Sequence, residues 1–453
     1  MVETLNAWIA AGASAVWGPW LVWTLFAVHL FLTVRTGFVQ RHIFRAIKLS
    51  ITPDKGAPGD VSQFGALVTA LAATIGTGNI FGVAGAVLIG GPGAVLWMWL
   101  TGVFGIATKY SEALLAVKYR VVNEHGEMRG GPMVVLERAL NAKWLGVIFA
   151  IFTALAAFGI GNMAQSNAIT EMLVAKKAFL PFALSDEAIK YGLGALMAIG
   201  TAFVIIGGIK SIARVCEVLV PFMAAFYVIG CLIILAFSWD KLGATFSLIV
   251  TSAFNGHAAV GGFAGAGIAA VMRAGIARGL FSNESGLGSA PIVAAAAQTK
   301  DPVRQALVSS TGTFWDTVVI CALTGLVVVS SGDWSGDGMT KASLCSSAFH
   351  HLGFFGDLIL LGGLLTFVFS TILGWSYYGE KAVEYLLGIR AVLPYRWLWV
   401  AAVFIGAVWK SGAVWDFSDM MNGLMAVPNI ISLFLLSHVI AAETKRYFAE
   451  NKS

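Results

Sequence analysis

The chain has 453 residues, of which 58% are hydrophobic and only 12% are charged. Soluble globular domains carry about 25% charged residues, so this composition excludes a water-soluble protein and predicts one embedded in a membrane. The net charge is +5, and the Lys and Arg lie in short loops between apolar runs, where they orient a membrane protein. They do not cluster on one amphipathic face, so the positive charge does not indicate nucleic-acid binding.

Eleven predominantly apolar segments are candidates for membrane-spanning helices, each of which needs about 20 residues. In chain order they lie at 13–36, 61–89, 92–117, 144–175, 190–209, 215–238, 246–272, 303–331, 354–379, 396–410 and 419–441. The sequence therefore predicts an all-α integral membrane protein of eleven helices.

The basic residues between these segments predict the orientation. If the N-terminus is outside and the loops alternate, the inside segments hold 23 of the 29 Lys and Arg, and the outside segments hold 6. Cytoplasmic loops of membrane proteins are enriched in Lys and Arg, so we expect an outside N-terminus and a cytoplasmic C-terminus. The first residues lack a basic segment, so no cleaved signal peptide is expected.

Leaving the first helix aside, the ten remaining helices divide into two sets of five with opposite orientation. We expect an extra helix and basic linker at 1–59, a first repeat at 60–238, and an inverted second repeat with the C-terminal tail at 239–453. The first helix of each half contains a glycine-rich run, at 76–79 and at 261–267. Paired interruptions of this kind indicate the binding site of a transporter. The alternative is that these glycines only let helices pack closely.

A broken helix exposes backbone N–H and C=O groups inside the membrane, where protein, water or ligand must satisfy them. The N-terminus of a half-helix attracts a carboxylate and its C-terminus attracts a cation. A zwitterionic amino acid together with Na⁺ would complement both kinds of end.

Three stretches of the sequence resemble the alanine or glycine:cation symporter family, within the amino acid–polyamine–cation superfamily. They are TIGTGNIFG at 74–82, GGPGAVLWMWLTGVFG at 90–105 and RGLFSNESGLGSAP at 278–291. The resemblance covers essentially the whole chain. It implies a LeuT-type fold with a 5+5 inverted repeat, and symport of alanine or glycine with Na⁺, or less often with H⁺.

The resemblance implies two cation sites. One would use Asn79 and the carbonyl or hydroxyl of Thr74, although Asn79 would serve equally as the cap of the second half-helix. The other would use the carbonyls of Ala72, Ile75 and Phe367 and the hydroxyls of Ser370 and Thr371. The alternative for these two hydroxyls is a bond back to a carbonyl of their own helix.

Further residues are candidates for contact with the substrate. We expect the N–H groups of Gly76, Thr77 and Gly78 to face its carboxylate, and Gln165, buried in mid-span, to contact its amine or carboxylate. The alternative for Gln165 is a hydrogen bond between helices only. Two aromatic residues, Phe263 and Trp375, are candidates for the walls of a small pocket. Aromatic residues of membrane helices otherwise serve packing or interfacial anchoring.

Asp316 lies inside the segment 303–331, and an acid within a membrane helix is a functional candidate. Cation binding, proton relay and pairing with a Lys or Arg are all open for it. No nucleophile–base constellation stands out, and the four cysteines give neither a disulfide framework nor a metal cluster, so no enzyme, cofactor or metal other than Na⁺ is expected. The sequence predicts a cell-membrane transporter coupling Na⁺ to small amino acids; the alternative is proton-coupled transport of a related solute.

Overall fold

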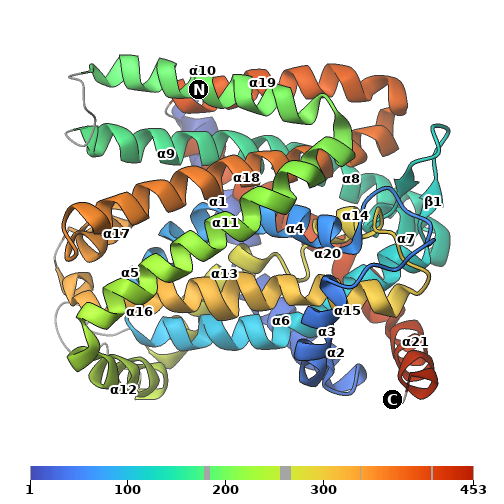
Figure 1. Ribbon diagram of the computed structural model, residues 1–453, viewed down its shortest axis with the longest axis horizontal. Helices are drawn as coiled ribbons and strands as arrows, with labels where there is room; N and C mark the ends of the chain where they lie inside the picture. The colour runs from blue at the N-terminus through green and yellow to red at the C-terminus, as the bar shows by residue number, and fades with distance from the viewer. Residues whose placement is uncertain (1, 178–183, 256–266, 337, 410–411, 452–453) are drawn as a thin grey trace.

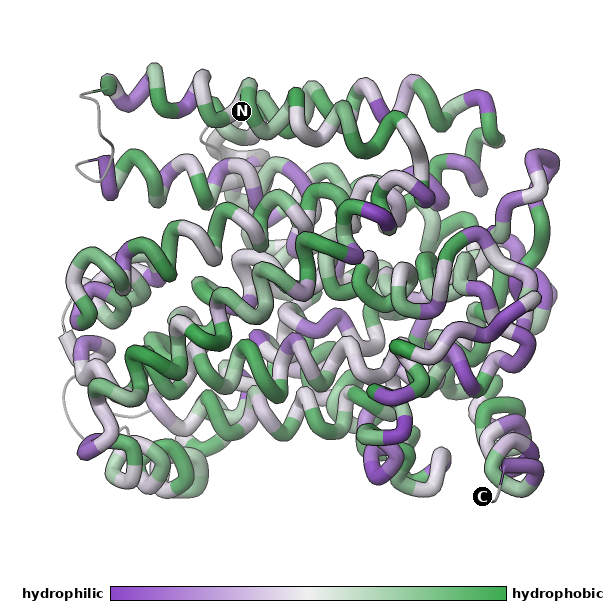
Figure 2. The backbone as a smooth tube through the Cα atoms, in the orientation of Figure 1, coloured by the Kyte–Doolittle hydropathy of each residue, from purple (hydrophilic) through white to green (hydrophobic). Residues whose placement is uncertain are grey.

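The computed structural model describes residues 2–177, 184–255, 267–336, 338–409 and 412–451, and most of them are helical. Long helices run side by side across the view, and most of their ends gather at two opposite ends of the molecule (Figure 1). Hydrophobic residues dominate the middle of these helices, and many hydrophilic residues lie at the end that carries β1 (Figure 2). The predicted all-α membrane class is therefore observed.

The first half of the chain contains one very short hairpin among its helices. Its elements are α1 (Val2–Val16), α2 (Pro19–Arg35), α3 (Ile43–Ser50), α4 (Gln63–Thr74), α5 (Phe81–Gly90), α6 (Gly93–Lys118), β1 (Val121–Val122), β2 (Met128–Arg129), α7 (Pro132–Leu140), α8 (Lys143–Phe158), α9 (Ala164–Ala175), α10 (Asp186–Ile205) and α11 (Gly208–Phe237). A π-helical turn, η3 (Gly159–Met163), joins α8 to α9, so that the predicted span at 144–175 is one continuous element.

The second half begins with α12. Its elements are α12 (Trp239–Asn255), α13 (Ile268–Asn283), α14 (Pro291–Ala294), α15 (Pro302–Thr313), α16 (Ala322–Ser331), α17 (Lys341–His350), α18 (Phe354–Leu387), α19 (Val392–Val408), α20 (Gly412–Leu435) and α21 (Ser437–Glu450). A second π-helical segment, η5 (Phe314–Cys321), joins α15 to α16. Helices α13 and α15 both pack against α6, so these three helices form one packed group.

The predicted number of spans is only partly confirmed. Within the described residues, seven helices are long and apolar enough to cross a membrane, or up to nine when each sharply bent pair is one span. Eleven spans are therefore not confirmed. The predicted span at 419–441 is wrong at its end, because the chain bends by 59° between α20 and α21.

The predicted span at 246–272 is not one continuous helix. Its two ends belong to different helices, because α12 ends at Asn255 and α13 begins after Gly267, whose backbone is extended. The predicted break at 261–267, with Phe263, lies almost entirely outside the described residues. In the described part of this half, the chain instead leaves the helical conformation after Asn283, at the end of α13.

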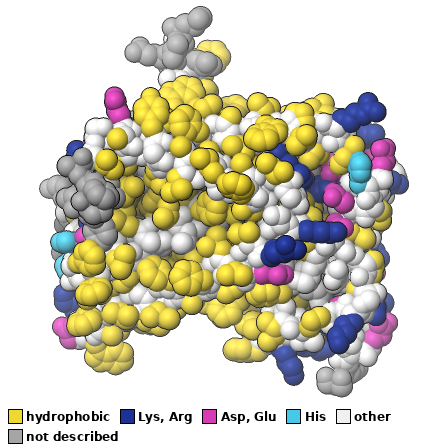
Figure 3. Space-filling view, turned by 45° about the horizontal axis from the view of Figure 1, so that its top comes forward, with side chains coloured by type: hydrophobic (Ala, Val, Ile, Leu, Met, Phe, Trp, Pro, Cys, Tyr) yellow, Lys and Arg dark blue, Asp and Glu magenta, His cyan; other side chains and the backbone are white. Residues whose placement is uncertain are grey.

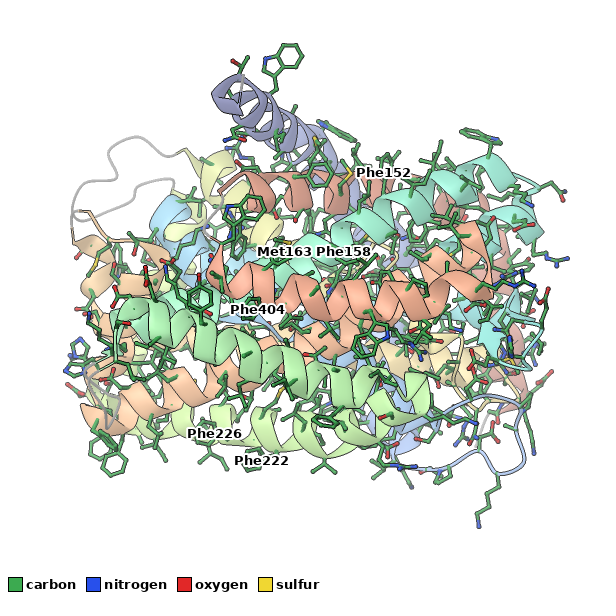
Figure 4. All side chains as sticks on the ribbon, turned by 90° about the horizontal axis from the view of Figure 1, so that it is seen from above. Phe152, Phe158, Met163, Phe222, Phe226 and Phe404 are labelled. Atoms are coloured by element: carbon green, nitrogen blue, oxygen red, sulfur yellow. The ribbon has the colours of Figure 1, made fainter. Side chains whose placement is uncertain are left out.

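The outer surface of the bundle is apolar. Phe203, Phe222 and Phe237 are each more than half exposed. Hydrophobic side chains cover most of the face in Figure 3, while most of its Lys and Arg lie toward one end. Phe222 and Phe226 of α11 stack at the edge of the molecule (Figure 4). Such a surface suits lipid, and it agrees with the exclusion of a soluble protein.

The end of the molecule that carries the β1–β2 hairpin, here called the hairpin face, is tied together by backbone hydrogen bonds. Val61, just before α4, forms a parallel bridge with Ala297, just after α14. Arg120, beside β1, donates hydrogen bonds to four carbonyl oxygens at this junction: those of Pro58, Ala295, Ala297 and Thr299. The segments that flank α4 and α14 are therefore held as one unit on this side.

Close approach of α6 and α13 depends on Gly275. A Cβ at this position would lie 2.2 Å from the carbonyl oxygen of Ala94 and 2.8 Å from Cβ of Trp97. Backbone cannot yield as a flexible side chain can, so we expect Gly275→Val to lower the free energy of unfolding by about 1–3 kcal/mol through overpacking. The thermal transition of the detergent-purified protein measures the effect.

Gly192→Val is the matched control, because a Cβ at Gly192 on α10 meets nothing within 4 Å. A Gly275→Val protein as stable as the Gly192→Val protein would contradict the close contact.

Candidate functional site

The first predicted break is present. Helix α4 ends at Thr74, a short turn η2 (Thr77–Asn79) follows, and α5 continues at 62° to α4. Ile75 and Asn79 are fully buried. The interruption therefore places polar backbone groups inside the protein, where they need partners.

Side chains supply partners for this break. The Oδ1 atom of Asn79 accepts a hydrogen bond from the N–H of Gly76 at 2.9 Å, and Oε1 of Gln165 accepts one from the N–H of Thr77 at 3.2 Å. The Nε2 atom of Gln165 donates to the carbonyl of Ile160 in η3. Asn79 thus has the capping role that was one alternative, and two N–H groups expected to face a carboxylate are bound to side chains.

Helix α18 lies directly against the break. The hydroxyl of Thr371 is 3.1 Å from the carbonyl oxygen of Ile75 and 2.9 Å from that of Phe367. The hydroxyl of Ser370 donates to the same Phe367 carbonyl at 2.9 Å. Both hydroxyls therefore bond within their own helix, and Thr371 also reaches the break. The structure brings Thr371 and Ile75 together, while Ala72 lies one turn earlier on α4.

Asp316, on η5, is fully buried and accepts three hydrogen bonds from side chains. Its carboxylate oxygens lie 2.7 Å from Nδ2 of Asn79, 2.9 Å from Oγ of Ser282 and 2.7 Å from Oγ1 of Thr317. Across the described ranges, no Lys or Arg forms an ion pair with it. Of the three roles left open, pairing with a basic side chain is therefore not observed, and the carboxylate joins Asn79 at the first break to α13.

The second half of the chain has its own interruption at 284–290, between α13 and α14, and all of these residues are buried. Glu284 begins it with a φ of +54°, in the left-handed region that side chains other than glycine rarely adopt. Its carboxylate accepts hydrogen bonds from Nε1 of Trp375 at 3.0 Å and from the hydroxyl of Ser289. Strain of this kind clusters at functional sites.

A second acid organises the same loop. Oε1 of Glu112, on α6, accepts hydrogen bonds from the N–H groups of Gly286 at 3.0 Å and Gly288 at 3.1 Å, and from Nδ2 of Asn429 at 2.6 Å. Neither Glu112 nor Glu284 was among the residues selected from the sequence. For Glu112, inside the segment 92–117, the available signal was an acid within an apolar segment, the signal that did select Asp316. Glu284 lay in a predicted loop between the segments 246–272 and 303–331, where this signal does not apply.

A narrow cavity lies between the two breaks. Gly76, Gly78 and Thr74 line it from the first break, Glu284 and Phe281 from the second, and Gln165, Thr371 and Trp375 from the surrounding helices. A wider cavity of about 540 Å³ adjoins it, reaching Thr77 and Gly78 and opening away from the hairpin face between α9, α17 and α20. Gly78 and Phe281 line both cavities, so they lie where the narrow site adjoins the wide vestibule.

The position of Trp375 depends on Gly161 in η3. A Cβ at Gly161 would lie 2.2 Å from Cβ and 2.3 Å from Cγ of Trp375. Trp375 is 1% exposed, so it has no free space to move into. The absence of a side chain at Gly161 therefore leaves room for the indole in the wall of the cavity.

Comparison with protein families places these features in context. Residues 2–453 match the model of the sodium:alanine symporter family. The chain is 48% identical to the sodium/alanine symporter AgcS of Methanococcus maripaludis, covering 99% of this chain and 96% of that protein. It is 33% identical to a probable sodium/glutamine symporter, GlnT, of Bacillus subtilis, covering 100% and 93%.

Two solved structures share the fold. A sodium-coupled sialic acid symporter in a substrate-bound, outward-open state aligns with a TM-score of 0.58 at 12% identity, covering 93% of this chain and 86% of that one. MhsT in complex with L-phenylalanine aligns with a TM-score of 0.53 at 15% identity, covering 86% and 99%. The fold is therefore of the LeuT type, as the sequence resemblance implied.

The packing of Gly161 on Trp375 gives a test of the narrow cavity. We expect Gly161→Ala to push the indole toward Gln165 and Glu284 and to weaken binding of radiolabelled alanine about tenfold or more, since displacements of about 1 Å at a site have effects of this size. Gly82→Ala is the control, because a Cβ at Gly82 on α5 meets nothing within 4 Å. Equal alanine affinity in the two variants would show that Trp375 does not bound the site.

Proposed function

The chain belongs to the sodium:alanine symporter family, and from this membership we propose that it carries alanine or glycine into the cell together with Na⁺ by alternating access. It is a sodium-coupled amino-acid symporter in the membrane, not an enzyme. We place the substrate site in the narrow cavity between the two breaks, because this cavity combines backbone N–H groups with the carboxylate of Glu284.

The cavity suits a zwitterion. In the proposed complex the substrate carboxylate lies at Gly76, Thr77 and Gly78, and it replaces the side-chain oxygens of Asn79 and Gln165 on the N–H groups that they now hold. The substrate ammonium lies toward Glu284. Trp375 closes the cavity on the side-chain end of the substrate, which favours hydrogen or methyl there. Phe263 stays a sequence prediction, since it lies outside the described residues.

Two sets of oxygen atoms suit Na⁺. Asp316 and the hydroxyls of Ser282 and Thr317 form the first, beside the break. Asn79 faces Asp316 with its Nδ2 donor, so its oxygen would join this set only after the amide turns away from Gly76, and Thr74 is proposed as a further ligand from the sequence resemblance. The second consists of the carbonyls of Ala72 and Ile75 and the hydroxyls of Ser370 and Thr371. Sodium prefers several oxygen ligands, as other hard cations do, and each set offers carbonyl, hydroxyl or carboxylate oxygens at a helix interruption. Asp316 thereby links the ion to Asn79 and so to the substrate.

Alternating access needs one side open and the other closed. The vestibule of about 540 Å³ opens on one side, and the Arg120 junction closes the other. We assign the hairpin face to the cytoplasm, with the N-terminus outside and the C-terminus inside. The sequence count placed Arg273 and Arg278 in an inside loop, but both line a cavity with Trp17 and Asp419 near the vestibule. When these two residues are counted as outside, the inside segments still hold most of the Lys and Arg.

The division into an extra helix at 1–59 and repeats at 60–238 and 239–453 is part of this proposal. Each repeat then contributes one break, at 75–80 and at 284–290, to the shared cavity. A bundle that carries both breaks would rock against the other helices and expose the cavity to the cytoplasm.

Uptake of radiolabelled alanine into proteoliposomes tests the function. We expect uptake under an inward Na⁺ gradient and none under an equal K⁺ gradient, with competition by excess glycine and not by leucine, because Trp375 limits side-chain size. Equal uptake in both salts would refute sodium coupling and lead to a pH-gradient experiment on Asp316. Competition by glutamine as strong as by glycine would refute the small-substrate assignment. The chain would then resemble the probable sodium/glutamine symporter GlnT in its substrate.

Thr371→Val tests the second sodium site. The substitution keeps the shape of the side chain and removes one oxygen ligand, so we expect the half-activating Na⁺ concentration for alanine uptake to rise about tenfold, equivalent to roughly 1.4 kcal/mol. Thr366→Val is the matched control, because Thr366 lies on the same helix and its hydroxyl bonds the Gly362 carbonyl one turn away. An unchanged sodium dependence in Thr371→Val would remove this hydroxyl from the site.

A further inference from the structure

Lys109 is a buried cation inside the bundle. It lies on α6, is 4% exposed, and within the described part of the chain its Nζ has no hydrogen-bond partner. A buried ammonium group without compensation is strongly unfavourable. Its charge must therefore be offset by groups farther away than a direct contact.

The surroundings of Lys109 connect it to both helix breaks. It lines a narrow cavity with Leu71 and Thr74, in the last turn of α4, and with Asn283, the last residue of α13. Both helices end here with their carbonyl groups, the ends that attract positive charge. Lys109 thus lies where a half-helix dipole would otherwise attract a free cation.

Three buried acids lie within electrostatic reach of Lys109. They are Glu112 and Glu284 at the second break and Asp316 in the proposed first sodium site. His29, packed behind the second break, lies within reach as well. Glu112 has a second carboxylate oxygen, Oε2, without a hydrogen-bond partner among the described residues. Lys109 is therefore a fixed positive charge that acts on the same carboxylates as an incoming ion.

We propose that Lys109 is a positioning residue that sets the affinity for Na⁺: as an internal counter-cation it offsets part of the negative charge of the site and keeps ion binding weak enough for release. The inference rests on the proposed function, since it presupposes that Na⁺ binds near Asp316. It also assigns a role to a charge that neither substrate nor Na⁺ needs to touch.

Removing the charge of Lys109 is expected to strengthen Na⁺ binding, the opposite of what structural damage would do. A unit charge acting across roughly 10 Å at an effective dielectric constant of about 20 changes ion affinity on the order of tenfold. We therefore expect Lys109→Gln to lower the half-activating Na⁺ concentration for alanine binding about tenfold while slowing uptake, because the ion leaves more slowly. Structural damage would weaken Na⁺ binding instead. Lys109→Arg keeps the charge and should keep the wild-type sodium dependence.

A second variant tests the charge with the opposite sign. Glu112→Gln removes one negative charge, and its amide oxygen can still accept the hydrogen bonds of Gly286 and Gly288. We expect it to raise the half-activating Na⁺ concentration, and the double variant with Lys109→Gln to return close to wild type. Lys118→Gln is the control on the same helix, because Lys118 is paired with Glu443 at its exposed end.

The measurement is alanine binding to purified protein over a series of Na⁺ concentrations, together with uptake in proteoliposomes and the thermal transition of each variant. A folded Lys109→Gln protein with unchanged or weaker Na⁺ affinity overturns the inference, and so does a Glu112→Gln protein with tighter Na⁺ binding. Chloride-dependent binding in wild type that is lost in Lys109→Gln also overturns it, since Lys109 would then hold an anion. Alanine binding by wild type that ignores Na⁺ refutes the proposed function instead.

Discussion

The structure depends on one constraint: backbone N–H and C=O groups inside a membrane must have partners. Two interruptions in the bundle leave such groups without helical bonds, and side chains of the break itself and of other helices satisfy several of them. Asn79 and Gln165 hold the first break, and Glu112 holds the second. The helices that supply these side chains are placed by that requirement, which explains why polar residues lie in the middle of apolar segments.

The same requirement suits a site that must exchange ligands. Hydrogen bonds to Asn79 and Gln165 keep the N–H groups of the first break satisfied. In the proposed complex the substrate carboxylate replaces these two acceptors at little net cost, because one set of bonds is exchanged for another. The π-helical segments η3 and η5 contribute to this arrangement, since η3 carries Gly161 and η5 carries Asp316. π-helical turns are frequent at functional sites.

The first break was predictable because Gly76 and Gly78 interrupt an apolar run at its centre. The second predicted break, at 261–267, lies almost entirely outside the described residues and stays a prediction. The interruption at 284–290 was not predicted, because glycine content alone does not show where a helix ends. Glu284, not a glycine, begins that loop with a left-handed backbone. The hydrogen bond from Asn79 to Asp316 joins residues 237 positions apart, and no local sequence pattern predicts such a contact. Averaged hydrophobicity also hid Lys109 and Glu112 within an otherwise apolar helix.

The junction at Arg120 has a consequence for how the closed side responds to its surroundings. Its guanidinium binds neutral carbonyl oxygens, and the strand-like bridge of Val61 and Ala297 adds bonds between uncharged groups. Salt screens interactions between exposed charges much more than hydrogen bonds to neutral backbone. Changes in salt concentration on this side therefore alter these hydrogen bonds less than they alter the exposed ion pairs of the molecule.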